Sequence, residues 1–277
     1  MILASAGVAA VAFATPDRAR RPLAPRRAVV QLDARPQQEI APRLRVASGA
    51  STALGFEEIA TIPRPGSQGL TMIKFSPDDR YVTYLGGVSA TSLTRQLYAF
   101  DRRTGKTAQV VTTTGGDEES FTREEQLRRE RARIMSTGLT AYQWAAKANR
   151  LLVPMDGALY VQDGVGPGSA ETLRRLFDPT DPTWAPVGAG PLLDPKLSDD
   201  GETVCFVWDA EVCCCAVSDV ADGGQPRRLT SGARGEGKTN GLADYCAQEE
   251  MSRYEGFWPS PGSAGMVAFE EVDERHI

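Results

Sequence analysis

Short apolar stretches separated by polar turns recur along the chain from about residue 70. Each stretch alternates apolar and polar positions and is bounded by Asp, Gly, Pro or Ser, as in MIKFSPDDRYVTYLGG at 72–87. Similar patterns return at 141–164, at 195–230 and from 256 onward. A period of two residues is typical of a half-buried β-strand. The pattern therefore predicts repeated units of short antiparallel strands.

The spacing of these units indicates a β-propeller. Aligning the first strands places Phe75, Trp144, Leu197 and Trp258 at equivalent positions, 69, 53 and 61 residues apart by subtraction. A four-stranded blade takes about 40–50 residues, so the excess measures insertions. We predict an all-β fold, a partial β-propeller of three blades and part of a fourth, because a sandwich would not show this repeat. An open arc of blades should leave an unpaired strand edge.

Two insertions interrupt the strand pattern. Residues 115–138 are rich in helix formers and pair Glu125 with Arg129 at i,i+4, which predicts an inserted arginine-rich helix. The second insertion, 233–256, carries two adjacent carboxylates, Glu249 and Glu250. Like charges side by side belong either to a solvated turn or to a site that holds a cation. Loops at blade ends are free to reach a shared site.

Composition excludes several classes of function. The net charge of −5 over 277 residues argues against a nucleic-acid-binding surface, which needs a basic face. Three of the five cysteines are consecutive, 213–215, so their side chains should alternate between two faces of a strand and stay free and buried. His276 is the sole histidine and no Cys-x-x-Cys occurs. We therefore expect no metal and no cofactor.

The N-terminal 50 residues differ from the rest. Residues 1–14 are apolar and end in Ala-Phe-Ala, but lack the basic start of a secretory signal and are too short to span a bilayer. Residues 16–30 are rich in arginine. The interpretation of 1–50 is either a targeting segment or a disordered tail, which leaves the compartment open. Nothing else in the sequence reaches membrane length, so membrane association is not indicated.

Residues 240–261, with 266–277, resemble the N-terminal propeller of the dipeptidyl peptidase IV family of serine exopeptidases. Residues 123–144 resemble the arginine-bearing helix of the branch that includes dipeptidyl peptidases 8 and 9 and bacterial enzymes. The resemblance covers about 70–277. It implies that 51–277 is an incomplete form of an eight-bladed propeller. It also implies a peptide substrate with a free N-terminus, from which Xaa-Pro or Xaa-Ala dipeptides are released, and homodimers as in many members.

The resemblance also implies roles for particular residues. Glu249 and Glu250 would bind the α-ammonium of the substrate, and a docked cation would relieve the repulsion between their carboxylates. By register, Arg133 would bind a substrate carbonyl, for which a guanidinium offers several fixed donors. Arg129 and Arg131 lie in the same stretch and remain alternatives to it. The alternative for each of these residues is a solvated surface position.

The sequence departs from the family pattern in two respects. Pro259 stands where the family has a strand residue with a backbone donor. No Gly-x-Ser-x-Gly elbow occurs, and His276 is poorly placed for a catalytic triad. We therefore expect the catalytic α/β-hydrolase domain to be absent and the chain alone to be inactive. The hypotheses are the recognition part of a longer peptidase, or a truncated non-catalytic propeller that serves as an interaction scaffold.

Overall fold

The structure, a computed structural model, divides the chain into two units. One comprises Met1–Ala14 with Ile62–Ile277, and the other comprises Thr15–Thr61 and contains helix α1 (Phe56–Ala60). The described residues are 7–12, 56–60, 69–89, 92–111, 113, 129–130, 135–181, 190, 192–218, 226–262 and 265–275.

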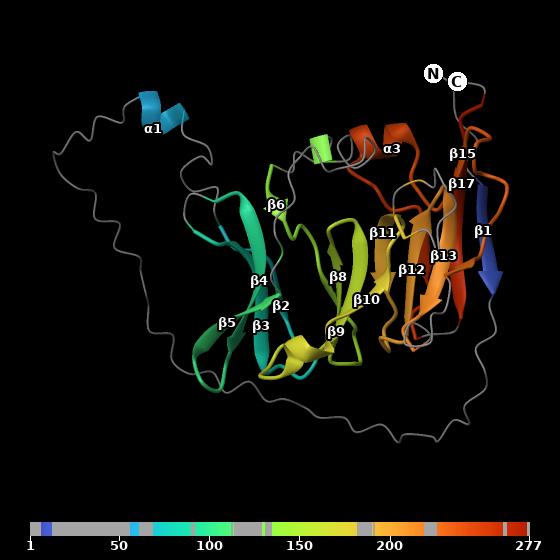
Figure 1. The fold of residues 1–277 in the computed structure, drawn as a ribbon. Coiled ribbons are helices and arrows are strands. Elements are labelled where there is room, and N and C mark those ends of the chain that lie inside the picture. The colour runs from blue at the N-terminus through green and yellow to red at the C-terminus, as the bar shows by residue number, and fades with distance from the viewer. Residues whose placement is uncertain are drawn as a thin grey trace, which may run out of the picture. The chain divides into compact units, whose positions relative to one another are not determined.

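Three four-stranded antiparallel units follow one another along the chain and lie side by side in chain order (Figure 1). Blade 1 consists of β2 (Thr71–Phe75), β3 (Tyr81–Gly87), β4 (Thr94–Asp101) and β5 (Lys106–Val111), with β6 (Thr137–Gly138) parallel to β4. Blade 2 consists of β7 (Gln143–Trp144), β8 (Arg150–Met155), β9 (Ala158–Asp163) and β10 (Arg174–Phe177), and a 3-10 turn at Ser169–Thr172 joins the last two. Blade 3 consists of β11 (Leu192–Leu197), β12 (Thr203–Trp208), β13 (Glu211–Ala216) and β14 (Arg227–Arg228). The predicted all-β partial propeller is confirmed.

Blade 4 is assembled from distant segments of the chain. Its strand β17 (Met266–Asp273) pairs with β16 (Phe257–Pro259) and with β15 (Lys238–Asn240). Strand β1 (Gly7–Ala12) also pairs with β17, antiparallel, with Gly7 opposite Glu271 and Ala12 opposite Met266. Strand β17 therefore has hydrogen-bonded neighbours on both sides. The small and β-branched residues at 7–12 form a strand that satisfies the backbone groups of β17.

A turn with the same Ser and Asp contacts recurs between the first two strands of blades 1 and 3, and it explains why these strands could be predicted from the sequence. Ser76 accepts the N–H of Tyr81 at 2.9 Å and donates to Asp78 at 2.5 Å, which closes the turn from β2 to β3. Ser198 and Asp200 make the same pair of contacts between β11 and β12. These turns need only Ser and Asp at a fixed spacing. The pattern is therefore local in sequence.

The strand register corrects one alignment. Phe75 lies opposite Val82, and in blade 4 it is Pro259 that lies opposite the equivalent Val267. Trp258 therefore takes the position of Lys74, one residue earlier than the sequence alignment indicated. Pro259 ends β16, so its missing N–H falls at a strand end rather than inside a ladder.

Side chains between neighbouring blades form three apolar clusters. The strands alternate, so each inner strand sends every second side chain to the blade before it and the others to the blade after it. In the second of the clusters, Phe177 stacks on Phe206 with ring centroids 5.0 Å apart, and Trp208 meets Phe177 edge-on. The clusters join blade 1 to blade 2, blade 2 to blade 3 and blade 3 to blade 4.

Hydrogen bonds also tie the first strand of each blade to the first strand of the next. The residue two positions before each turn uses its side chain to reach a backbone carbonyl of the following blade. These donors are the long side chains of two lysines and one glutamine, which can span the gap between blades. The contacts are Lys74 Nζ to Tyr142 O at 3.1 Å, Gln143 Nε2 to Leu197 O at 3.1 Å, and Lys196 Nζ to Phe257 O at 2.6 Å.

The cysteines depart in part from the prediction. Cys213 and Cys215 are buried on one face of β13 and form no disulfide, as expected. Cys214 lies on the opposite face and forms a disulfide with Cys205. The signal was present in the sequence, because a two-residue turn between β12 and β13 places these two cysteines directly opposite each other. Cys246 is free and exposed.

This arrangement predicts selective alkylation. Burial raises the pKa of Cys213 to about 12, so its reactive thiolate is scarce at neutral pH. Iodoacetamide at pH 7.5 should therefore label only Cys246 in the folded chain, measured by mass spectrometry of peptides. Denaturant without reductant should add Cys213 and Cys215, and denaturant with reductant should label all five. Labelling of Cys205 or Cys214 without reductant would contradict the disulfide.

Candidate functional site

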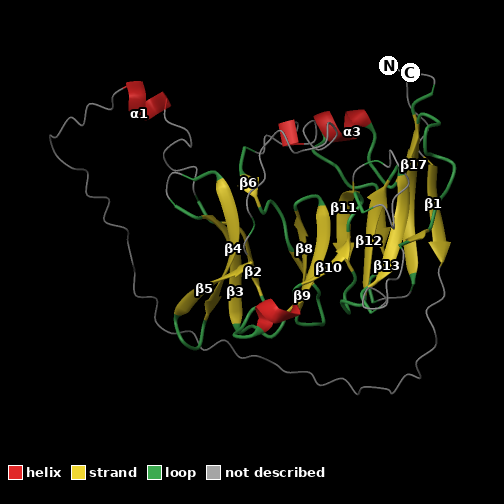
Figure 2. Ribbon diagram, in the orientation of Figure 1, coloured by secondary structure: helices red, strands yellow, loops and turns green. Residues whose placement is uncertain are grey.

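The two predicted glutamates lie on a short helix between β15 and β16. Helix α3 (Tyr245–Glu250) begins at Asp244, whose carboxylate accepts the N–H of Ala247 at 3.0 Å and so caps the first turn. Glu249 and Glu250 are its last two residues, and both side chains are exposed. Figure 2 shows α3 among the loops at one end of the strands rather than on a sheet face.

A narrow neck holds the α3 segment at its base. Leu242 and Glu255 form an isolated antiparallel bridge on either side of the helix. Gly256 follows directly, and a Cβ there would lie 2.4 Å from the carbonyl carbon of Leu242. No side chain fits in that space, so the close approach of the two segments requires glycine.

A partly buried ion pair holds the chain in place where it leaves helix α3. Arg253 donates to both carboxylate oxygens of Glu270 in β17, at 2.7 and 3.3 Å, and to the carbonyl of Glu255 at 2.9 Å. The backbone N–H of Arg253 also donates to Ala247 in the helix. Hydrogen bonding to Glu270 raises the pKa of Arg253, so the guanidinium stays charged at any working pH. Glu270 is buried, whereas Arg253 is partly exposed.

A second buried carboxylate fixes the entry to the segment. Glu211, at the start of β13, accepts the hydroxyl of Thr230 at 2.6 Å, the N–H of Ala233 at 2.7 Å and the side-chain amide of Asn240 at 2.9 Å. Three donors compensate for the loss of water around this buried group. Residues 230–240 are thereby held against blade 3 before the chain reaches α3.

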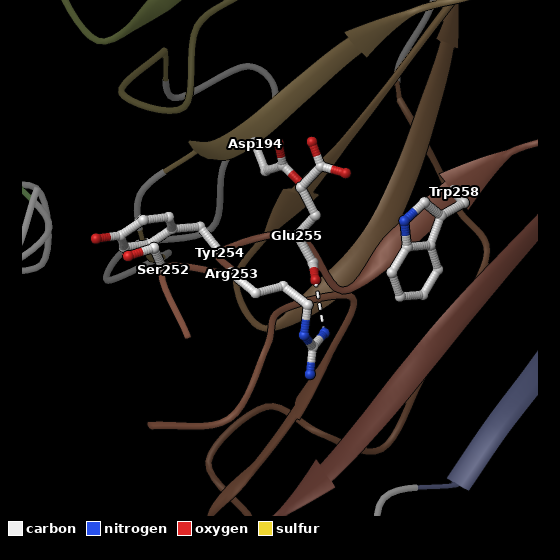
Figure 3. A pocket seen from close by; sticks show the side chains of 6 residues that line it. All are labelled: Asp194, Ser252, Arg253, Tyr254, Glu255 and Trp258. Carbon is white, nitrogen blue, oxygen red and sulfur yellow. Dashed lines mark hydrogen bonds between the residues drawn. The ribbon is translucent and has the colours of Figure 1, made fainter. Parts of the chain in front are cut away.

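A hollow of about 410 Å³ opens beside the end of α3 (Figure 3). Asp194 enters it from a bulge in β11, with a left-handed φ of 46°. Lys196 lies 3.2 Å from the carboxylate of Asp194 and 3.4 Å from that of Glu255. The side chain of Trp258 is partly exposed on the opposite side of the hollow. The lining residues are Asp194, Ser252, Arg253, Tyr254, Glu255 and Trp258.

This arrangement suits a small cation. Glu249 and Glu250 end a helix, where the backbone dipole is negative and a negative side chain is disfavoured. No basic residue occupies the last turn of α3. A positive group bound there would reduce both the repulsion between the carboxylates and their conflict with the dipole. The exposed indole of Trp258 adds a flat apolar surface to the nearby hollow.

The structure does not place the predicted Arg133 at the candidate site. Arg133 and Arg131 lie outside the described residues, so neither is placed relative to α3. Arg129 is described: it belongs to a helical turn with Glu130, is buried, and donates to the carbonyl of Ser136. Residues 115–128 and 131–134 of the predicted helix also lie outside the described residues. At the end of the predicted helix, Thr137–Gly138 form the short strand β6, so the prediction of a helix up to residue 138 is wrong there.

Arg253, Glu270 and Glu211 were not predicted. Each acts on residues distant in sequence or across strands, and nothing in the local pattern distinguishes them from ordinary charged residues. Within the described ranges, no group of three or more His, Cys, Asp or Glu is placed to hold a metal ion. In the described part of the chain, no helix has the length and apolar character needed to cross a membrane.

Comparisons with known proteins converge on one family. Residues 156–277 match the model of the dipeptidyl peptidase IV N-terminal region. Human dipeptidyl peptidase 8 is 27% identical over 175 residues, which cover 57% of this chain and 18% of that protein. Mouse dipeptidyl peptidase 8 is 26% identical over the same length. The chain thus spans less than a fifth of the length of these relatives.

The anchor of the segment can be tested by breaking it. Arg253→Ala leaves Glu270 buried without its cation, which should lower the free energy of unfolding by about 2 kcal/mol, less than for a fully buried pair because Arg253 is partly exposed. Urea unfolding measures the change, and hydrogen exchange should show loss of protection in α3. The matched control, Arg253→Met with Glu270→Leu, removes both charges and should recover most of the stability. Unchanged stability in Arg253→Ala would refute the anchoring role.

Proposed function

We propose that this chain recognises the free N-terminus of a peptide substrate, because residues 156–277 match the model of the dipeptidyl peptidase IV N-terminal region. It would be the recognition part of a serine exopeptidase that releases Xaa-Pro or Xaa-Ala dipeptides. The observation that carries the proposal is the pair of exposed carboxylates at the end of α3, beside a hollow of peptide-residue size. Glu249 and Glu250 bind the α-ammonium.

The chemistry of an ammonium explains the selectivity of such a site. A free N-terminus carries a positive charge at neutral pH, whereas an internal peptide bond carries none. An internal segment offers the two carboxylates no positive charge from its backbone. The site therefore selects peptides by the position of their N-terminus rather than by their amino-acid sequence.

The rigid base of α3 supports this role. A site that discriminates by position needs its charged groups held firmly, because a displacement of about 1 Å weakens recognition severely. The cap at Asp244, the Arg253–Glu270 pair and the Glu211 cluster fix the segment on blades 3 and 4. The side chains of Glu249 and Glu250 are exposed at the end of the helix on this base.

Cleavage itself needs groups beyond these. A serine nucleophile on a Gly-x-Ser-x-Gly elbow does not occur in the 277 residues. In the proposal the present chain binds and orients the substrate. Arg133, assigned from register, would hold a substrate carbonyl as the second contact. The compartment and the preferred side chains of the substrate are not part of the proposal.

A second candidate function, an interaction scaffold without catalysis, is favoured by a different observation. The first strand of blade 1 exposes large apolar side chains that the other blades bury. An exposed apolar patch of this kind is typical of a surface that contacts another protein. The two functions are compatible, because the patch lies on blade 1 and α3 lies between two strands of blade 4.

The proposed function predicts that binding depends on a free amine. A Val-Pro-Ala peptide should bind the 277-residue chain, and its N-acetylated form should bind at least about tenfold more weakly. Glu249→Gln and Glu250→Gln keep the helix and remove one charge each, and each should weaken binding of the free peptide by a similar factor. Isothermal titration calorimetry or NMR titration measures both effects.

Glu171→Gln is the matched control, since Glu171 is an exposed glutamate in the 3-10 turn of blade 2. It should leave the affinity unchanged. Equal binding of the acetylated and free peptides, or wild-type affinity in both α3 variants, would refute the assignment.

A further inference from the structure

Lys196 holds two of the carboxylates that line the hollow beside α3. Its Nζ lies 3.2 Å from the carboxylate of Asp194 and 3.4 Å from that of Glu255, and it donates to the carbonyl of Phe257 at 2.6 Å. An ammonium group has three N–H donors, so these three acceptors match all of them. The centre of the Phe257 ring lies 4.3 Å from the same nitrogen. Lys196 is therefore a built-in ammonium between two carboxylates.

These contacts lie inside the arc, between blades 3 and 4. Lys196 and Asp194 belong to β11 in blade 3, and Phe257 belongs to β16 in blade 4. Glu255 stands at the base of the α3 segment, in the bridge with Leu242. The side chain of Lys196 is 16% exposed, and the Asp194 oxygen nearest to it is shielded from solvent. The carboxylates of Asp194 and Glu255 lie next to each other in the wall of the hollow (Figure 3).

The equivalent positions in blades 1 and 2 show that the link between blades does not need this arrangement of charges. Gln143 makes the same contact with a neutral amide, and Lys74 makes it with an amine. Among the described residues, no carboxylate lies within ion-pair distance of Lys74, and burial lowers the pKa of Lys74. Of these three positions, only Lys196 is paired with carboxylates.

The backbone at Asp194 does not require an acid either. Asp194 is the left-handed residue of the bulge in β11, with a φ of 46°. Blade 1 has the same bulge in β2, where the left-handed residue is Met72, with a φ of 52°. Both residues stand two positions before the lysine of their strand. The bulge therefore accepts an uncharged side chain, and its geometry alone does not explain the carboxylate of Asp194.

We propose that Lys196 is a specificity-determining residue that keeps cations out of the hollow. Its ammonium occupies the place between Asp194 and Glu255 where another positive group would otherwise bind. A second cation beside it would be repelled, because like charges about 4 Å apart oppose each other even in water. The hollow therefore accepts uncharged groups, although two carboxylates line it.

This assignment deepens the proposed function and, in its bearing on peptides, rests on it. A peptide N-terminus is itself an ammonium, so the hollow and α3 would otherwise compete for it. With Lys196 in place, the N-terminus is directed to Glu249 and Glu250. The side chain that enters the hollow is an uncharged one. The substrate class is thus a peptide with a free N-terminus and an uncharged first side chain.

The first test uses n-butylammonium, which resembles a lysine side chain, and 1-butanol as its neutral counterpart. Lys196→Gln removes the charge but keeps a donor that can reach the next blade, as Gln143 does. The variant should bind n-butylammonium about tenfold more tightly than the wild-type chain, and 1-butanol with unchanged affinity. An NMR titration that follows the indole N–H resonance of Trp258, which lines the hollow, measures both affinities.

Two controls separate the effect of charge from a loosened fold. Lys74→Gln is the same substitution at the equivalent position of blade 1 and should leave both affinities unchanged. Adding Asp194→Asn and Glu255→Gln to Lys196→Gln removes the acceptors and should return n-butylammonium binding to the wild-type level. If Lys196→Gln does not fold, Glu255→Gln in the wild-type chain tests the charge balance from the other side: n-butyrate should bind it about tenfold more tightly.

The second test extends the assignment to peptides. Lys-Pro-Ala and Met-Pro-Ala have first side chains of similar length, one charged and one neutral. The wild-type chain should bind Met-Pro-Ala more tightly, and Lys196→Gln should shift the ratio of the two affinities about tenfold toward Lys-Pro-Ala. Isothermal titration calorimetry measures this ratio. N-acetylated Met-Pro-Ala, titrated beside them, reports separately on the proposed function.

Three results with the small probes would overturn the proposal. The first is equal affinity of the wild-type chain and Lys196→Gln for n-butylammonium. The second is an equal gain for 1-butanol, because that would reflect opened space rather than charge. The third is the same gain in Lys74→Gln, because the effect would then belong to the link between blades.

The peptides distinguish failure of the inference from failure of the proposed function. An unchanged ratio of Lys-Pro-Ala to Met-Pro-Ala in Lys196→Gln would overturn the assigned substrate class. Equal binding of free and acetylated Met-Pro-Ala would refute the recognition of the N-terminus. In that case n-butylammonium still decides the role of Lys196, since its binding is measured without a peptide.

Discussion

Face-to-face packing between successive blades is the constraint on which the rest of the molecule depends. A four-stranded sheet has two apolar sides, and neither can be satisfied by the sheet itself. Stacking the blades buries both sides of blades 2 and 3 and one side of each end blade. Phe177 and Phe206, stacked at 5.0 Å between blades 2 and 3, show how closely these surfaces fit. The first strands add hydrogen bonds across the same interfaces.

The candidate site inherits its geometry from this packing. Phe257 is buried against blade 3, so β16 cannot move independently of β11 and β12. The segment that carries α3 starts from the Glu211 cluster on blade 3 and ends at the Arg253–Glu270 pair on blade 4. In each anchor a buried carboxylate, that of Glu211 or Glu270, accepts hydrogen bonds from groups of the segment. The exposed glutamates of α3 therefore stand on two blades held together by their apolar faces.

Local features of the molecule were predictable from sequence, and distant ones were not. The turn formed by Ser76 and Asp78 depends on residues close together in the sequence. The strands that flank such turns, and with them the propeller, could therefore be predicted. The pairing of Cys205 with Cys214 was also readable from a two-residue hairpin, but a general preference for free thiols outweighed it. The position of β1 on β17 joins segments more than 250 residues apart, and no local pattern specifies such a contact.

The site divides in the same way. Glu249 and Glu250 were identified because they are adjacent and lie in a recognisable stretch, and the structure places both on α3. Arg253 and Glu270 are 17 residues apart on either side of β16, and their pairing follows only from the blade geometry. The fit of Gly256 against Leu242 depends on a backbone approach that cannot be inferred from a lone glycine.

The most direct test of the account is a crystal structure of the chain with a saturating Val-Pro-Ala peptide. The account predicts that the peptide ammonium lies within hydrogen-bonding distance, about 3 Å, of the carboxylates of Glu249 and Glu250. It also predicts that the first side chain of the peptide enters the hollow beside Trp258. An ammonium bound instead at Asp194 and Glu255, or an empty site under saturating conditions, would contradict the assignment of α3 as the group that recognises the N-terminus.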